Sequence, residues 1–369
     1  MAARKQGVDL FKPRVAALRR RLKAKQLDAL LLTRAVDVRY LTGFCGEDSW
    51  VLVPMSRGRV VVISDKRFEE EIAETAPGVT AVMREGAIGP AAGGVIAKRG
   101  FERVGFDAAE LTVAEKASLA KACRPAKLVS VPVDMTGQRS VKDEHELKMI
   151  RRAVAIQQKA FVDTVGWMSA GMTEVEVAAY LEYRIRAHGG EGVSFPTIVA
   201  AGERSSLPHA MPTSKKLKRN GVVLFDWGAK YGGYCSDMTR VVSLGRMPKQ
   251  MAEVYEVVLQ AQLAGIAAIA PGVRLSDVDG ASRAVIEKAG YGDRFIHSLG
   301  HGIGLEIHEE PRLWGKAKGV LEPGQVVTVE PGVYLPGVGG VRIEDDVLVT
   351  GRGHEVLCDL PKDLASASL

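Results

Sequence analysis

The chain has 369 residues, which is enough for two or three domains of ordinary size. Apolar residues make up 46% of it and charged residues 25%, as in globular proteins, so a disordered chain, a membrane-embedded chain and a small disulfide-stapled scaffold are all disfavoured. The 50 basic and 44 acidic residues leave a net charge of +6, too small by itself to indicate a nucleic-acid partner.

The N-terminal segment MAARKQGVDLF lacks the apolar core of a secretion signal, and no apolar run approaches the roughly 18 residues of a spanning helix. The basic residues from Arg14 to Lys25 accompany apolar positions at helical spacing, and we interpret them as the solvated face of a helix. The four cysteines lie far apart without a CxxC pair. We therefore expect a cytoplasmic protein with reduced thiols and no nucleic-acid or membrane partner.

Residues 1–135 alternate short β-type runs with helical stretches, which predicts an α/β domain. The predicted strands of this domain are Ala29–Thr33, Trp50–Pro54, Val60–Ser64, Val104–Asp107 and Leu128–Val133.

Residues 136–369 have a different texture, which predicts an α+β domain. From Lys142 the apolar positions recur at helical spacing for over twenty residues, and Thr173 with Glu176 forms a capping-box pattern at the start of a further helix. A faint repeat at a separation of 101 residues suggests two halves, each a helix pair followed by a hairpin, around a pseudo-two-fold axis. Its matched positions are Ala160/Ala261, Gly171/Gly272, Val177/Val278, Ile185/Ile286 and Gly189/Gly290.

The segment VVLFDWGAKYGGYCSDMTRVV reads as two apolar strands joined by a glycine turn. With Gly232–Gly233 as the turn, Asp226 lies opposite Thr239 and diagonal to Asp237; with Tyr231–Gly232 as the turn, the two aspartates are direct partners. In either register they share one face at about 5–8 Å, where like charges repel. Such a pair on apolar strands needs a cation, and we expect a divalent metal ion.

A second acidic pair lies further along the chain. Glu330 ends the apolar run VVTVE, and Glu344 lies in GGVRIEDD, with a loop rich in glycine and proline between them that can close a second hairpin. A single carboxylate is normally exposed, but four carboxylates on apolar strands of two similar hairpins indicate one shared site.

Histidines accompany these carboxylates. Three of the seven, His297, His301 and His308, fall within FIHSLGHGIGLEIHE, and His209 lies in SSLPHAMP before the first hairpin. Carboxylates with one or two imidazoles and no thiolate suit a pair of divalent ions of the manganese, cobalt or zinc kind. The HExxH, GxxxxGK[ST] and GxSxG motifs are absent from the sequence, which disfavours nucleotide binding and serine-hydrolase chemistry.

At these residues the chain resembles the Xaa-Pro metallopeptidases, the prolidase and aminopeptidase P group of the pita-bread fold, over nearly its full length. DVRYLTGF at residues 37–44 resembles the creatinase-type N-terminal domain, and PHAMP, FDWGAKYGGYCSDMTR, HSLGHGIGLEIHEEP, VVTVEPGVY and GGVRIEDD follow in the family's order. The resemblance implies an α/β creatinase-like domain at 1–135, an α+β pita-bread catalytic domain with the internal repeat at 136–369, and a homodimer.

The resemblance also implies two divalent ions per chain, with Mn²⁺ the first expectation and Co²⁺ or Zn²⁺ the alternatives. The five ligands that it implies are Asp226, Asp237, His301, Glu330 and Glu344. Asp237 and Glu344 would bridge the ions, and Glu330 would also move the proton of the attacking water. His209 and His308 would stabilise the tetrahedral intermediate and hold the substrate backbone.

Three further residues bear on the substrate. His297 either supports another group or contacts the substrate directly. Arg342 resembles the family's arginine behind the metal ligands, and Arg312 lies where some prolidases grip the dipeptide carboxylate, a contact that a planar guanidinium suits. Because of Arg312, which could equally be a surface residue, we favour an Xaa-Pro dipeptidase over an aminopeptidase that acts on longer peptides.

Other readings remain open. A sister hydrolase of the same scaffold, such as methionine aminopeptidase or a creatinase-like amidinohydrolase, fits the N-terminal domain or the ligand set less well, and the complete ligand set disfavours a catalytically silent interaction module. We expect Trp227 and Tyr231 to pack in the core or hairpin rather than to line a proline pocket, and Cys235 to be a buried hydrophobe rather than a ligand. The expected partner is a proline-containing dipeptide or oligopeptide.

Overall fold

The structure is a computed structural model that describes residues 2–131 and 135–369, with side chains described from residue 10 onward. The chain divides into two compact units, Met1–Gln138 and Arg139–Leu369. None of the described helices combines the length and the apolar character needed to cross a bilayer. The four cysteines are free.

The first unit is built on a six-stranded mixed sheet with the strand order β4-β3-β2-β1-β5-β6. Its strands are β1 (Ala29–Leu32), β2 (Trp50–Pro54), β3 (Val61–Asp65), β4 (Thr80–Arg84), β5 (Arg103–Phe106) and β6 (Lys127–Ser130). Its helices are α1 (Ala2–Leu22), α2 (Ala35–Thr42), α3 (Glu69–Thr75), α4 (Ile88–Lys98) and α5 (Val113–Ala122), and α6 (Met135–Ser140) crosses the division between the units.

Four of the predicted strands of this unit are present within one residue of their expected bounds, and the fifth, predicted as Leu128–Val133, is present as β6 and ends at Ser130. Residues 132 and 133 of the last predicted strand lie outside the described part of the chain. The sequence analysis missed β4, an edge strand that pairs in parallel with β3 and is only half buried. Its mixed composition, TAVMR, lacks the apolar alternation by which the other strands were identified.

The interpretation of the N-terminal basic residues as a solvated face is wrong for Arg14. This side chain is buried, donates from Nη1 to the Tyr40 carbonyl at 3.0 Å and lies over the Tyr40 ring at 4.5 Å. Arg19 is partly buried and donates to the carbonyls of Pro54 and Gly58, each at 2.8 Å. Long aliphatic stems allow arginines on a packed helix to cover apolar surface while the guanidinium finds carbonyl partners.

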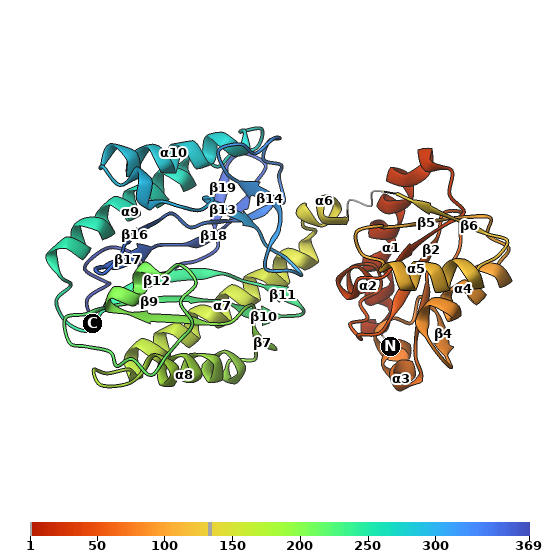
Figure 1. Cartoon of the computed structure of the whole chain (residues 1–369), viewed down its shortest axis with the longest axis horizontal. Helices are drawn as coiled ribbons and strands as arrows, with labels where there is room; N and C mark the ends of the chain where they lie inside the picture. Colours follow the sequence, from red (N-terminus) through yellow and green to blue (C-terminus); the bar gives the residue numbers. More distant parts are fainter. Residues whose placement is uncertain (1, 132–134) are drawn as a thin grey trace. The chain divides into compact units, whose positions relative to one another are not determined.

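The second unit contains two helix pairs and the strands between them. The helices are α7 (Glu144–Trp167), α8 (Glu174–Ala187), α9 (Lys249–Ala267) and α10 (Leu275–Lys288). In Figure 1 the pairs α7–α8 and α9–α10 lie on opposite sides of the strands of this unit. The expected capping box of Thr173 and Glu176 opens α8, and a second one, Asp143 with Glu146, opens α7.

The matched positions of the internal repeat have the same backbone conformation or the same burial in both copies. Gly171 and Gly272 both have left-handed backbone conformations, with φ of 95° and 84°, as do Gly189 and Gly290, with 91° and 84°. The matched apolar positions are fully buried in both copies: Ala160 and Ala261, Val177 and Val278, Ile185 and Ile286. Gly171 and Gly272 therefore lie in the turn between the two helices of each pair, and Gly189 and Gly290 follow the end of the second helix.

The strands of the second unit form four sheets, with the orders β11-β10-β7, β12-β9-β8, β14-β13-β15-β18-β19 and β16-β17. The strands of its first half are β7 (Gly192–Val193), β8 (Ile198–Ala201), β9 (Val222–Trp227), β10 (Ala229–Tyr231), β11 (Tyr234–Cys235) and β12 (Met238–Ser243). Those of its second half are β13 (Gly300–Gly302), β14 (Glu309–Leu313), β15 (Val326–Val329), β16 (Gly332–Leu335), β17 (Gly339–Arg342), β18 (Asp345–Val349) and β19 (His354–Val356).

Candidate active site

The first hairpin places two aspartates in a definite register. Tyr231 pairs with Tyr234, so Gly232 and Gly233 form the turn, and both have the positive φ, 57° and 79°, that glycine adopts freely. Asp226 therefore lies opposite Thr239, as the first of the two considered registers predicts. Asp237 precedes β12 and is diagonal to Asp226.

The second hairpin places two glutamates directly across from each other. Val329 pairs with Asp345 and Gly332 pairs with Arg342. Both pairs belong to one continuous register, in which Glu330 and Glu344 are the next partners. The two hairpins thus differ, since one offers a diagonal pair of carboxylates and the other an opposed pair.

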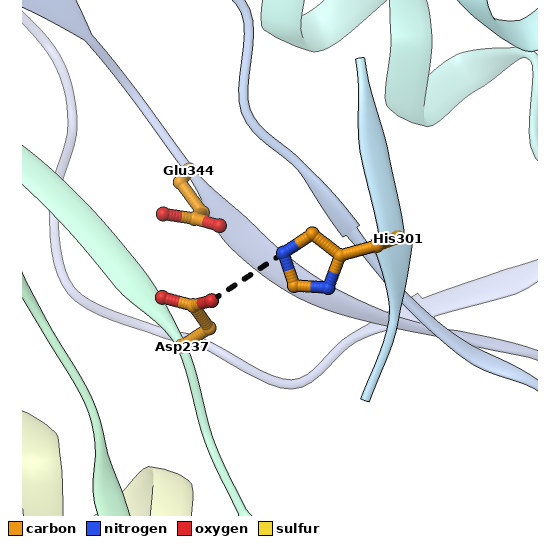
Figure 2. A group of neighbouring side chains, drawn as sticks. All are labelled: Asp237, His301 and Glu344. Carbon is orange, nitrogen blue, oxygen red and sulfur yellow. Dashed lines mark ion pairs between the residues drawn. The ribbon is translucent and has the colours of Figure 1, made fainter. Parts of the chain in front are cut away.

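Residues from both hairpins and from β13 meet at one point. Ligand atoms of Asp237, His301 and Glu344 all lie within 4.8 Å of one another, and all three residues are buried. The His301 Nε2 atom is 3.7 Å from Asp237 Oδ2 and 3.4 Å from Glu330 Oε1. Figure 2 shows the two carboxylates side by side with the imidazole of His301 turned toward them from the facing strand.

Burial makes these carboxylates hard to ionise without a cation. Burial and the neighbouring charges of Glu344 and Asp226 raise the pKa of Asp237 well above its usual value. Burial, with Glu330 and Asp226, does the same to the pKa of Glu344. Burial raises the pKa of Glu330 to about 8, although Arg342 opposes the shift. A low-dielectric site with several negative charges favours the neutral carboxyl unless positive charge is supplied.

Several oxygens at this point have no partner. Within the described part of the chain, Asp226 Oδ1, Asp237 Oδ1 and Glu344 Oε1 are buried without a hydrogen bond. Buried oxygens normally have a partner, so these three require one that the chain does not supply.

The histidine at this point is suited to bind a metal ion. Burial lowers the pKa of His301 to about 3, so its imidazole is neutral. Because Nδ1 donates to the Gly302 carbonyl at 3.1 Å, the lone pair is on Nε2, which points at the carboxylates. A neutral imidazole oriented by a backbone carbonyl is the usual form of a histidine metal ligand. The oxygens and this nitrogen therefore fit divalent cations.

Arg342 links the ligand candidates to the cavity wall. It donates to Asp226 Oδ2 at 2.5 Å, to Thr239 Oγ1 at 3.0 Å and to the Tyr334 hydroxyl at 2.8 Å. Thr239 in turn donates to Glu344 Oε2 at 2.6 Å. The guanidinium therefore orients carboxylates from both hairpins, and it counters part of their charge.

Tyr334 is a site residue that the sequence analysis missed. Its hydroxyl donates to His297 Nε2 at 2.9 Å, because His297 Nδ1 already donates to the Ser298 carbonyl at 2.8 Å. Burial lowers the pKa of His297 to about 4, so the ring stays neutral, and burial raises the pKa of Tyr334 to about 12. Its position four residues after Glu330 was the available signal, but an aromatic residue on a strand is ordinarily read as core.

One cavity of about 780 Å³ contains every site residue predicted from the sequence. Its polar lining consists of Tyr334, Ser298 and the ten predicted residues His209, Asp226, Asp237, His297, His301, His308, Arg312, Glu330, Arg342 and Glu344. The His308 ring stands edge-on to His301 at 4.4 Å, and burial lowers its pKa, with Arg312 as the next cause. Apolar residues that sequence patterns did not indicate complete the wall: Phe195, Pro196, Ile198, Pro208, Met211, Ile296 and Ile307.

The residues expected to be structural do not line this cavity. Trp227 is fully buried, stacks on Phe161 at 4.4 Å and donates from Nε1 to the Gln157 carbonyl. Tyr231 lies beneath the guanidinium of Arg152. Cys235 is buried, and its backbone N–H donates to the Gly304 carbonyl at 2.7 Å.

A second buried acidic group lies beside the cavity. Glu309 follows His308 in the chain, and its side chain is only 1% exposed. Lys142 Nζ donates to its Oε2 at 3.0 Å, and Arg139 Nε lies 3.3 Å from its Oε1. Arg139 also pairs with Glu306. These cations, from the first residues of the second unit, fix the loop that carries His308.

Comparison with known proteins gives consistent matches along the chain. The model of metallopeptidase family M24 matches residues 148–351, and that of the creatinase/prolidase N-terminal domain matches residues 14–141. An uncharacterized peptidase, YqhT of Bacillus subtilis, is 38% identical, and the alignment covers 92% of this chain and 95% of that protein.

Solved structures of Xaa-Pro peptidases match this chain over nearly its whole length. The Xaa-Pro dipeptidase from Bacillus anthracis has a TM-score of 0.92 at 37% identity and covers 97% of this chain and 100% of its own. The X-Pro aminopeptidase from Thermotoga maritima has a TM-score of 0.86 at 35% identity, and the match covers 91% of this chain and 97% of that protein. The expected combination of a creatinase-type N-terminal domain with a pita-bread domain is thereby confirmed.

Proposed function

Because the chain belongs to metallopeptidase family M24, we propose that it is a dinuclear-metal Xaa-Pro dipeptidase, which hydrolyses the peptide bond before proline. The observation that carries the proposal is the convergence of buried, unpartnered carboxylate oxygens of Asp226, Asp237 and Glu344 with the neutral imidazole of His301. The dipeptidase and aminopeptidase among the solved relatives have the same fold over nearly the whole chain.

We propose that two divalent ions bind to the five residues Asp226, Asp237, His301, Glu330 and Glu344, with Mn²⁺ as the first candidate and Co²⁺ or Zn²⁺ as alternatives. Such ions supply an acidified water near neutral pH and polarise a carbonyl group. Asp237 and Glu344, whose ligand atoms lie with that of His301 within 4.8 Å of one another, would contact both ions, as the resemblance to the family implies. The oxygen-rich ligand set contains no thiolate, which supports a hard or intermediate cation.

The remaining side chains act on the substrate. Glu330 lines the cavity beside His301 and is assigned the transfer of the proton from the attacking water to the leaving nitrogen. His209 and His308 line the same cavity and are assigned as donors to the carbonyl oxygen as negative charge develops on it. His297 is assigned an orienting role, because both of its ring nitrogens are already bonded to Ser298 and Tyr334.

The cavity walls suit the leaving group. The bond before proline has no N–H, so a site for it must accommodate the ring rather than rely on a donor from that nitrogen. The apolar wall formed by Phe195, Pro196, Ile198 and Ile296 offers such a surface. Arg312 lines the same cavity, and a guanidinium there suits the carboxylate of a dipeptide. The expected cytoplasmic homodimer stays part of the proposal.

The test is a peptide panel with the Mn²⁺-loaded protein, measured by proline release and mass spectrometry. We expect metal-dependent cleavage of Ala-Pro, weaker cleavage of Ala-Pro-Ala, and none of Met-Ala. Preferential release of alanine from Ala-Pro-Ala would instead support an Xaa-Pro aminopeptidase, the second candidate, which the Thermotoga maritima relative favours. Cleavage of Met-Ala alone would contradict both the Xaa-Pro dipeptidase and the Xaa-Pro aminopeptidase hypotheses.

A further inference from the structure

A second cavity of about 770 Å³ adjoins the substrate cavity. The two share the residues of the 296–298 segment and Arg312 as lining. Arg312 and the 296–298 segment therefore lie at the border between the two cavities. None of the roles assigned above uses the second cavity, which we call the outer cavity.

The floor of the outer cavity is one face of β14. Along this strand Glu310 and Arg312 are exposed while their neighbours are buried, and Trp314 continues the alternation beyond its end. Lys316 and Lys318 follow in the next loop and line the same cavity. Of these residues only Arg312 also lines the substrate cavity.

The outer cavity has an uncompensated positive charge. Within the described part of the chain, no hydrogen bond or ion pair engages the side chains of Arg312, Lys316 or Lys318. The other cation of the lining, Arg283, is already neutralised by two hydrogen bonds to the Asp279 carboxylate. Glu310 is the one unpaired acidic residue among the described lining residues, so three cations face one carboxylate.

We propose that the outer cavity binds the part of a peptide that follows proline, and that it selects an acidic residue at the first position after proline. The inference rests on the proposed function and extends it from dipeptides to Xaa-Pro-Yaa peptides in which Yaa is Asp or Glu. An anionic side chain or terminal carboxylate there would meet Lys316 and Lys318, which lack partners in the described structure.

In this proposal Arg312 contacts the carbonyl or carboxylate group of the proline, so that residues after proline lie in the outer cavity. In a dipeptide the carboxylate ends at the proline and meets Arg312 at the junction of the cavities. In a longer peptide the same position holds a peptide carbonyl, to which a guanidinium also donates, and the chain continues into the outer cavity. Trp314 and Ile296, which are 44% and 66% exposed, supply apolar surface beside which an extended backbone can lie.

The experiment compares Ala-Pro-Glu, Ala-Pro-Lys and Ala-Pro with the metal-loaded enzyme and with the variant Lys316→Glu/Lys318→Glu. We expect kcat/KM for Ala-Pro-Glu to exceed that for Ala-Pro-Lys by about tenfold at low salt, and the preference to reverse in the variant. The preference should shrink in 0.5 M salt, where the Debye length is only about 4 Å. Glu-Pro-Ala serves as a further substrate, because it places the acidic residue before proline.

The control variant is Lys218→Glu/Lys249→Glu, which makes the same change in net charge at two exposed lysines of the same unit outside the cavity lining. It should keep the preference of the unchanged protein. Equal rates for Ala-Pro-Glu and Ala-Pro-Lys, or a preference that both double variants alter equally, would overturn the inference. A higher kcat/KM for Glu-Pro-Ala than for Ala-Pro-Glu, lost only in Lys316→Glu/Lys318→Glu, would also overturn the inference. The outer cavity would then hold the residue before proline.

A wrong proposed function can be distinguished from a wrong inference about the outer cavity. If no proline peptide is cleaved, calorimetric titration of the metal-loaded protein with Ala-Pro-Glu and Ala-Pro-Lys decides the inference alone. Tighter binding of Ala-Pro-Glu that Lys316→Glu/Lys318→Glu abolishes supports an anion-selective peptide cavity without peptidase activity. Equal binding of the two peptides contradicts it.

Discussion

The catalytic unit contains two buried acidic clusters that are neutralised in different ways. At Glu309 the chain supplies its own cations, because Lys142 and Arg139 lie against the carboxylate. At Asp237 and Glu344 no described cation donates a hydrogen bond to either carboxylate, although Arg342 lies near Glu344, and Asp237 Oδ1 and Glu344 Oε1 lack hydrogen-bond partners among the described residues. A carboxylate that only has to hold a loop can be paired permanently, whereas one that has to bind metal must be left without a partner.

The same contrast occurs between consecutive residues. Asp345 follows Glu344 directly, and it receives hydrogen bonds from Arg240, Gln262 and Lys362. Burial alone would raise the pKa of Asp345, but Arg240 and Lys362 hold it below its usual value, whereas the pKa of Glu344 is raised well above. Alternation on the strand sends one carboxylate to a cationic pocket and the other to the cavity.

The largest expected effect is that of Asp237→Asn. The amide keeps the size of the side chain but removes a charge shared by both proposed ions, so activity should fall on the order of 10³-fold or more, with loss of stoichiometric metal. Because the amide needs no proton when it is buried, whereas the carboxyl group of Asp237 must take one up on folding, the metal-free protein should become more stable to urea at pH 8 by about 1–3 kcal/mol. Metal content is measured by mass spectrometry and stability by fluorescence.

Glu203→Gln, a change at an exposed residue of the same unit, serves as the control for Asp237→Asn. It should leave activity, metal content and stability to urea unchanged. Retention of two ions and of activity in Asp237→Asn would show that the bridging assignment is wrong.

The paired cluster should respond in the opposite way. Lys142→Met leaves the buried Glu309 with Arg139 as its remaining cation among the described residues, and we expect the free energy of unfolding to fall by about 2–4 kcal/mol. Adding Glu309→Gln should recover most of this loss, because a neutral amide tolerates burial better than a carboxylate. Additive losses in the double variant would show that Lys142 acts through packing rather than charge. Urea titrations of the four proteins complete the cycle.

Stability of the metal-free protein should depend on pH above neutrality. Glu330, with a pKa raised to about 8, and Asp237 and Glu344, raised well above their usual values, keep protons in the folded state that the unfolded chain releases near pH 4. Between about pH 7 and about pH 9 the unfolded state therefore binds fewer protons; Glu330 alone should lower the free energy of unfolding by about 1 kcal/mol over this range, and Asp237 and Glu344 should add to the fall. His297 and His301 have lowered pKa values and oppose this trend only below about pH 6.5.

Urea denaturation in the presence of a chelator measures this slope. Saturation with Mn²⁺ should flatten it, because the ions replace the protons on the carboxylates. A metal-free protein whose stability is constant from pH 7 to about pH 9 would contradict the assignment of raised pKa values to the cluster.

Local signals predicted much of the fold and the residues that gather in the cavity. The glycines at 232 and 233 limited the hairpin to two registers, and the structure has the one that places Asp226 opposite Thr239. The repeat could be predicted because the turns between and after its helices place glycine with positive φ at fixed positions. The paired cluster could not, since Lys142 and Glu309 are 167 residues apart and only tertiary packing brings them together. Tyr334 was missed because nothing local distinguishes a hydroxyl that bonds His297 from one in a core.

The smallest expected effect tests how the chain supports its unpaired cluster. Thr239 accepts from Arg342 and donates to Glu344, so it joins the carboxylates of both hairpins. Thr239→Val keeps the shape and removes the hydroxyl, and we expect Mn²⁺ affinity to fall about tenfold, with a change in stability within about 1.5 kcal/mol. Thr239→Ser retains the hydroxyl and should restore the affinity. If Thr239→Val binds Mn²⁺ as tightly as the unchanged protein, the hydroxyl does not contribute, and orientation of Glu344 rests on Arg240, which donates to its backbone carbonyl at 2.6 Å.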